Sequence, residues 1–178
     1  MAIGAFGIVN RLVFIVVMIV MGLNQGMQPI AGYNFGAKLY GRVNKVLRLT
    51  IIYATAVTTF GFLVGMLVPD LVVGIFTSDA ELTELSVTGL RITVMFFPII
   101  GFQMVTSNFF QSIGMAGKAI FLSLTRQMLI LLPCLLVLPQ FFGVAGVWYS
   151  MPVSDLLASL IALVMLVCQF RKFRTSPL

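Results

Sequence analysis

The residue best suited to chemistry is Asp155, the one acid within a stretch apolar enough to cross a membrane. It follows Trp148, whose aromatic ring suits a membrane surface, by about two helical turns, and it follows Pro152 by three residues. A carboxyl in hydrocarbon is costly and usually carries a proton, binds a cation or pairs with a base. We expect Asp155 either to do such ion chemistry or to serve structure. In the structural case it satisfies backbone groups freed by Pro152, or pairs with Arg11 or Arg91 near the outer surface.

A stripe of polar side chains is the second candidate. Gln103, Ser107 and Gln111 recur every four residues in another apolar stretch, so on a helix they share one face, with Asn108 beside them. Polar side chains in a membrane usually face the interior of a helix bundle or a water-filled path. The stripe therefore predicts either a surface along a substrate path or hydrogen bonds between helices, worth about 0.6 kcal/mol each.

The composition also excludes several kinds of chemistry. The 178 residues contain no histidine, which removes the commonest metal ligand and every Ser-His or Cys-His nucleophilic pair. Cys134 and Cys168 both lie in apolar stretches without zinc-type spacing, so we expect neither a disulfide nor a metal site. We expect no cofactor and no enzymatic reaction.

The overall composition places these residues in a membrane. Hydrophobic residues make up 60% of the chain and charged residues 9%, whereas a soluble domain carries about 25% charged residues. The sequence pI near 9.8 does not indicate nucleic-acid binding, because the bases lie in short loops and a tail between apolar runs. We therefore expect an all-α polytopic protein in contact with the lipid bilayer and not with nucleic acid.

Five stretches are long enough for membrane-spanning helices, each of which needs about 20 mostly apolar residues. The third stretch holds Pro98 and Gly101 near its middle, which predicts a kink there. The connections are short, so we expect one domain. The predicted spans are about Ile8–Ile30, Leu49–Val68, Thr88–Phe110, Ala119–Leu138 and Val144–Phe170.

The basic residues indicate an orientation, since membrane proteins keep most of their Lys and Arg in cytoplasmic loops. Four bases lie in the first connection and three follow the last span, which places both regions in the cytoplasm and the N-terminus outside. Arg126, about two turns beyond Lys118 in the fourth span, is long enough to extend toward the same inner surface, which gives eight or nine inner bases of eleven. Arg11 and Arg91 are exceptions near outer ends. The expected inner bases are Lys38, Arg42, Lys45, Arg48, Lys118, Arg171, Lys172 and Arg174, besides Arg126.

Two shorter signals concern local structure. The run Ser78–Glu81 has the form of a capping box, in which Ser78 accepts a hydrogen bond from the amide of Glu81. It predicts a short amphipathic helix on the outer surface that runs into the third span, its acids forming a solvated face and not a cation site. Gly61 and Gly65, four residues apart, predict close packing of another helix against the second span.

The run Gln28–Ala37 joins the first span to the basic connection. Pro29 lacks an amide hydrogen, so a helix that reaches it must bend or stop, and Gly32 and Gly36 let a second helix come close. Tyr33 has the apolar body and polar tip that suit a membrane surface.

As a string, Gln28-Pro29-x-x-Gly32-Tyr33-Asn34-x-Gly36-Ala37 resembles the signature in the second half of bacterial MATE (multidrug and toxic compound extrusion) transporters. In that family it follows the eighth of twelve membrane helices. The resemblance continues, in order, through Gly7–Arg11, Phe76-Thr77, Phe110–Gly114, Arg126-Gln127 with Pro133, and Gly146–Trp148. It therefore covers nearly the whole chain.

The resemblance implies a partial transporter. MATE proteins consist of two six-helix lobes around a central cleft. By the resemblance, residues 1–178 match helices eight to twelve, which are the C-terminal lobe without its first helix. The implied partners are the N-terminal lobe of the same transporter, the bilayer and small-molecule drugs. The implied activity is export of cationic or amphipathic drugs across the bacterial inner membrane in exchange for Na⁺ or H⁺. We interpret the chain as a fragment of such a transporter.

The resemblance does not identify the coupling ion. The cation sites of the family use an acid on helix one, or acids on helices seven and ten. Helices one and seven have no counterpart in this sequence, and Thr88–Phe110, which matches helix ten, contains no acid. The choice between Na⁺ and H⁺ therefore stays open.

Other functions are also open. A lipid-linked oligosaccharide flippase of the same superfamily shares the fold but needs a cationic cavity, whereas the bases here lie mostly at helix ends. A non-transporting assembly subunit would bind other membrane proteins through small-residue faces. An intramembrane enzyme would need a Ser-His or Ser-Lys pair, paired membrane aspartates or His-rich metal spacing, which the sequence lacks.

Overall fold

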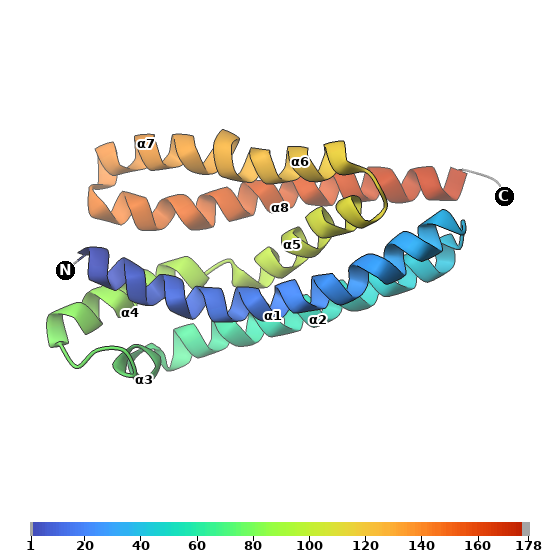
Figure 1. Cartoon of the computed structure of the whole chain (residues 1–178). Coiled ribbons are helices and arrows are strands. Elements are labelled where there is room, and N and C mark those ends of the chain that lie inside the picture. Colours follow the sequence, from blue (N-terminus) through green and yellow to red (C-terminus); the bar gives the residue numbers. More distant parts are fainter. Residues whose placement is uncertain (1, 176–178) are drawn as a thin grey trace.

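Every element in the part of the chain that the computed structural model describes, residues 2–175, is a helix. Figure 1 shows two layers, one with α1, α2 and the broken pair α4–α5, and one with α6, α7 and α8. α5 joins the layers, because it packs against α1 and α2 on one side and α8 on the other. The elements are α1 (Ala2–Gly36), α2 (Tyr40–Leu67), α3 (Pro69–Gly74), α4 (Ala80–Val94), α5 (Phe97–Ser112), α6 (Ala116–Leu124), the π-helix η1 (Thr125–Leu131), α7 (Leu132–Phe142) and α8 (Val144–Thr175).

The predicted membrane spans are confirmed as helices, with longer bounds than predicted. Among the residues that the structure describes, four stretches are long and apolar enough to cross a membrane by themselves, and the bent pair α4–α5 makes a fifth when it is counted as one span. The four are Ile3–Gly36, Tyr40–Leu67, Ala116–Phe142 and Val144–Arg171. Many large apolar side chains on these helices are exposed, as suits faces that meet lipid or another part of a membrane protein.

The predicted kink in the third span is confirmed and is a complete break. α4 and α5 are bent by 54° at a break after Val94. Pro98 follows in the first turn of α5, where its missing amide costs no helical hydrogen bond. Gly101 lies one turn further on and allows α5 to approach α2 closely, since a Cβ atom there would lie 2.8 Å from the carbonyl oxygen of Ala54.

Two expectations about helix ends are wrong. The first span does not end near Ile30, because α1 passes Pro29 and continues for seven more residues to Gly36. In lipid no water is available to bond the backbone N–H and C=O groups, so ending the helix would leave more of them unpaired than the one hydrogen bond that is lost at proline. The helix therefore continues past Pro29. The cap of α4 is Asp79 and not Ser78, since Asp79 Oδ1 accepts from the amide of Leu82 at 2.9 Å. An aspartate one residue later caps as well as serine.

Small residues set the spacing between helices at several predicted places. A Cβ atom added to Gly61 would lie 2.9 Å from the side chain of Val16, and one added to Gly65 would lie 3.1 Å from the side chain of Val94. These short distances confirm close packing against the second span. The packing at Gly32 is equally close, because a Cβ atom added there would lie 2.9 Å from the carbonyl oxygen of Ser112. Gly36 has nothing within 4 Å, so only the first glycine of that pair permits a close approach.

The hairpin between α7 and α8 depends on a glycine. Gly143 has a φ of 57°, which L-residues with side chains rarely adopt, and it turns the chain between two antiparallel helices. Behind the turn, the backbone at Gly146 lies against the backbone of Leu138. This close pairing places the polar residues of the last two spans next to each other.

Candidate functional site

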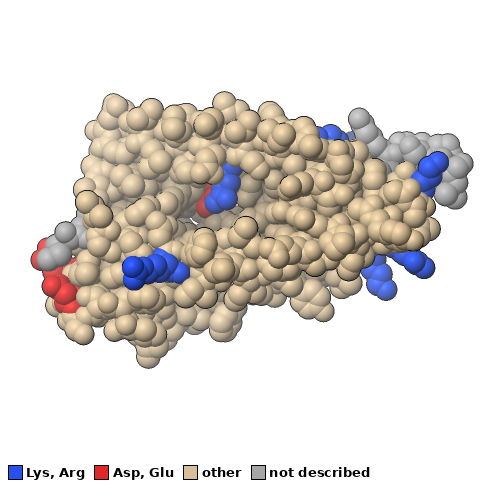
Figure 2. All heavy atoms as spheres, in the orientation of Figure 1, with Lys and Arg blue, Asp and Glu red and all other residues tan. Residues whose placement is uncertain are grey.

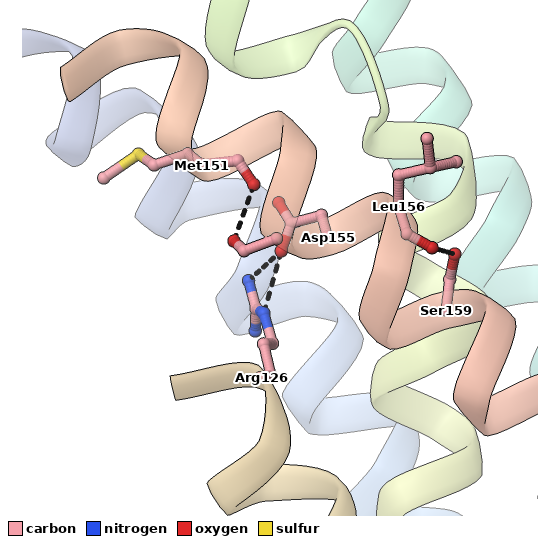
Figure 3. Close-up of polar contacts among 6 residues, drawn as sticks. Arg126, Met151, Asp155, Leu156 and Ser159 are labelled. Atoms are coloured by element: carbon pink, nitrogen blue, oxygen red, sulfur yellow. Dashed lines mark hydrogen bonds and ion pairs between the residues drawn. The ribbon is translucent and has the colours of Figure 1, made fainter. Parts of the chain in front are cut away.

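An ion pair joins the last two spans. Arg126 Nη2 lies 2.7 Å and Arg126 Nε 2.8 Å from the same carboxylate oxygen, Asp155 Oδ1. Figure 3 shows Arg126 pointing from its own helix toward Asp155 on α8. The Asp155 side chain is 7% exposed and the Arg126 side chain 34% exposed. The acid is therefore buried and the base reaches open space.

The pair lies near the middle of the membrane-spanning segments. At about 1.5 Å of rise per residue, Asp155 is roughly 16 Å along α8 and Arg126 roughly 15 Å from the start of α6. The hydrocarbon core of a bilayer is about 30 Å thick. Both charges thus lie where an unpaired charge is most costly, and each neutralises the other.

A π-helix positions Arg126. η1 interrupts the fourth span at Thr125–Leu131, and the amide of Leu132 donates to the carbonyl of Gln127, five residues back. Pro133 lies two residues beyond η1, and in an α-helix its ring would clash with the carbonyl of Leu129. π-helical turns are rare and occur often at functional sites. Here the turn presents Arg126 and Gln127 together toward α8 and α1.

A cavity of about 230 Å³, lined by both polar and apolar side chains, adjoins the pair. Figure 2 shows a blue and a red group together in a hollow between the two layers of helices. The cavity has an apolar wall, which includes Phe97, Met104 and Leu131. Its polar and charged lining residues are Asn10, Thr93, Arg126, Gln127, Ser154 and Asp155. A space of this size and lining can hold several waters or a small polar group.

The expected partners of Asp155 are wrong. Arg11 and Arg91 are exposed, and Arg126 is the base that pairs with the acid. The expectation that Arg126 extends to the inner surface is wrong for the same reason. Snorkelling would leave Asp155 charged and alone in a low-dielectric interior, which costs more than the pair does. A base and an acid inside consecutive apolar spans were the sequence signal for this pair.

The polar stripe on α5 divides among several environments. Gln103 is buried, whereas Gln111 is exposed. Ser107 Oγ lies 3.3 Å from Ser123 Oγ on α6, and Asn108 accepts from Gln28 Nε2 on α1 at 3.2 Å. None of these four stripe residues lines the cavity beside Asp155. The contacts of Ser107 and Asn108 are of the interhelical kind, and a role along a substrate path stays a prediction.

The signature residues at the end of α1 have structural contacts. Gln28 bonds to α5 through Asn108, and Asn34 Nδ2 donates to the carbonyl of Ile30 at 2.8 Å, one residue after Pro29. Tyr33 is 77% exposed, as expected of a residue at a membrane surface. Within the signature, Gln28 and Gly32 therefore contact α5, whereas the bond of Asn34 stays within α1.

Comparison with known proteins gives consistent matches. The MatE family model matches residues 1–136. The multidrug export protein MepA of Staphylococcus aureus (strain MSSA476) is 28% identical over 162 residues, which cover 91% of this chain and 36% of MepA. The chain thus spans about a third of the length of the curated relatives that it matches.

Solved structures of transporters share the fold. A structure of the MATE multidrug transporter DinF-BH superposes with a TM-score of 0.87 at 37% identity, over 96% of this chain and 38% of that one. An outward-facing multidrug resistance MATE family transporter of the MOP superfamily gives 0.88 at 18% identity, over 97% of this chain and 39% of that one. The arrangement of helices described above is therefore part of a larger known fold.

Proposed function

The chain belongs to the MATE family of membrane transporters, and on that premise we propose that it forms the C-terminal lobe, without its first helix, of a drug/cation antiporter. The whole transporter exports cationic or amphipathic drugs across the bacterial inner membrane in exchange for Na⁺ or H⁺. Two lobes alternate in access around a central cleft. The chain itself catalyses no chemical reaction.

The observation that carries this proposal is the match over nearly the whole chain. Relatives that align over 91% and 96% of it are named as multidrug export or multidrug transport proteins. The matched part is about a third of the length of these relatives, and under this proposal the other lobe belongs to the rest of the transporter. The exposed apolar side chains of α1, such as Phe14 and Met18, fit a face that meets that lobe or lipid.

The basic residues support an orientation with this chain's N-terminus outside and its C-terminus in the cytoplasm. The connection between α1 and α2 and the end of α8 lie at one end of the molecule (Figure 1). Bases gather at that end, and acids gather at the opposite end (Figure 2). The positive-inside rule assigns the basic end to the cytoplasm.

Asp155 has two roles to be distinguished. A carboxylate held by a guanidinium at 2.7 Å is already neutralised, which favours a structural role in holding η1 against α8. Ion coupling instead requires Arg126 to withdraw into the open space that it already reaches, so that a proton or Na⁺ replaces it. Under ion coupling, Asp155→Asn abolishes drug efflux although the protein still folds, and normal efflux by that variant rules coupling out.

The substrate path is proposed to include the α5 face of Gln103, Ser107, Asn108 and Gln111, together with the cavity beside Asp155. Ethidium efflux from cells that express the natural gene product tests the whole proposal. The expected result is efflux that collapses when one of the two gradients, Na⁺ or proton, is removed. The gradient whose removal stops efflux identifies the coupling ion. Absence of efflux for every cationic dye tested, from a protein shown to be in the membrane, contradicts it.

A further inference from the structure

A second and larger cavity, of about 600 Å³, lies between α2 and α8, away from the ion pair. It opens where α2 begins and where the described side chains of α8 end, the end of the molecule that carries most of the bases. Each of the two helices contributes one arginine and apolar side chains to the lining. Its lining residues are Tyr40, Asn44, Leu47, Arg48, Ile51, Ile52, Val167, Phe170 and Arg171.

The charge of this cavity has one sign. Arg48 contributes from α2 and Arg171 from α8, so two separate helices each place a guanidinium at it. A neighbouring cavity shares Asn44, Arg48 and Ile52 and adds Lys45. The five acids of the sequence are Asp70, Asp79, Glu81, Glu84 and Asp155, and none belongs to either lining.

The position of the arginines corresponds to the head-group region of a bilayer. Arg48 is eight residues into α2, roughly 12 Å along the helix at 1.5 Å per residue. Beyond it, Ile51 and Ile52 continue the same lining toward the hydrocarbon, and Ile52 is 52% exposed. Val167, 43% exposed, faces the same cavity from α8. The cavity therefore changes from cationic to apolar along the direction in which a lipid changes from head group to acyl chain.

We propose that this cavity binds one anionic phospholipid, with its phosphate between Arg48 and Arg171 and an acyl chain along Ile51, Ile52 and Val167. Basic pockets between membrane helices on the cytoplasmic side are the kind of site that takes phosphate head groups. Guanidinium groups form charge-assisted, often bidentate hydrogen bonds to phosphate oxygens. A cationic drug would be repelled by the same two charges, so this site is separate from the proposed drug path.

Lipid binding to the natural, full-length protein, measured by native mass spectrometry from mild detergent, tests the proposal. Phosphatidylglycerol is titrated in parallel with zwitterionic phosphatidylcholine. The test variant is Arg48→Gln with Arg171→Gln, both exposed positions whose loss should not unfold the protein. The matched control is Lys38→Asn with Arg42→Gln, which removes the same charge at the same end but from exposed residues outside the lining of the large cavity.

The expected result is one tightly retained phosphatidylglycerol per protein and no equivalent phosphatidylcholine. Affinity for it should fall about five-fold for each arginine removed, and weaken with salt, while the control stays near the parent. A further variant, Val167→Phe, keeps both charges but fills the apolar part of the cavity, and it should also weaken retention.

Three results would overturn the proposal. Equal retention of the two lipids would remove the need for an anionic head group. If the control variant loses as much affinity for phosphatidylglycerol as the test variant, the lipid is held by the overall positive charge at this end of the protein and not by a specific site. Displacement of the lipid by soluble glycerol phosphate, with Val167→Phe unaffected, would assign the arginines to a free phosphate compound instead.

Discussion

Two nitrogen atoms of Arg126 contact one carboxylate oxygen of Asp155 near the middle of the membrane-spanning segments. Nη2 lies 2.7 Å and Nε lies 2.8 Å from Asp155 Oδ1. The contact joins a π-helical turn to α8. Because one partner is 7% exposed and the other 34% exposed, the acid depends on the base more than the base depends on the acid. That asymmetry gives the first prediction.

Removing one member of the pair should destabilise the protein, and removing both should restore most of the stability. Arg126→Gln leaves a buried carboxylate without its base, at a cost of about 3 kcal/mol, while Asp155→Asn leaves a base that can still reach the open cavity and should cost less. The double variant should approach the parent. Thermal unfolding of the purified full-length protein measures all three, and equal losses for the two single variants would contradict this account.

The cap of α4 provides a second prediction. Asp79→Ala should lower the stability of the helix by about 1 kcal/mol, because the amide of Leu82 loses its acceptor. Ser78→Ala is the matched control and should have little effect. Hydrogen exchange of the Leu82 amide is the direct readout, and faster exchange in the Ser78 variant than in the Asp79 variant would show that the cap has been misplaced.

The sequence predicted the helices better than the contacts between them. Apolar length alone identified five spans, and Pro98 with Gly101 identified the break in the third, because these effects act within one segment. The partner of Asp155 depends on which helix packs beside α8 and on the one-residue shift that η1 introduces at Arg126. Such information is spread over three spans and their packing, so a reading of one span at a time selected Arg11 and Arg91 instead.

The same distinction applies to the polar stripe on α5. Spacing correctly placed Gln103 and Ser107 near one face of a helix, but burial differs along it, from a buried Gln103 to an exposed Gln111. The hydrogen bond from Gln28 to Asn108 joins residues 80 positions apart, and no local pattern predicts it.

That hydrogen bond gives a third prediction. Gln28→Ala and Asn108→Ala should each weaken the contact between α1 and α5, and a double-mutant cycle should show a coupling of about 0.6 kcal/mol. Thermal unfolding of the parent, the two single variants and the double variant provides the cycle. Additive losses would mean that the signature glutamine and Asn108 do not act together.

The close approach of α5 to α2 gives a fourth prediction. In Gly101→Ala the new methyl group would lie 2.7 Å from Thr58 Oγ1 and 2.8 Å from the carbonyl oxygen of Ala54, so the helices must separate. The expected cost is about 1–3 kcal/mol. Gly26→Ala in α1 is the control, since nothing lies within 4 Å of the added atom. Similar unfolding temperatures for the two variants would contradict the packing described here.

The most direct test of the central claim is dye transport by the purified full-length transporter in sealed proteoliposomes. With a Na⁺ or a proton gradient imposed across the vesicle membrane, we predict that ethidium moves against its own gradient for one of the two ions and stops when that gradient is collapsed. Movement that continues without any ion gradient, or no movement with either gradient in correctly inserted protein, would contradict the assignment of this chain to a drug/cation antiporter.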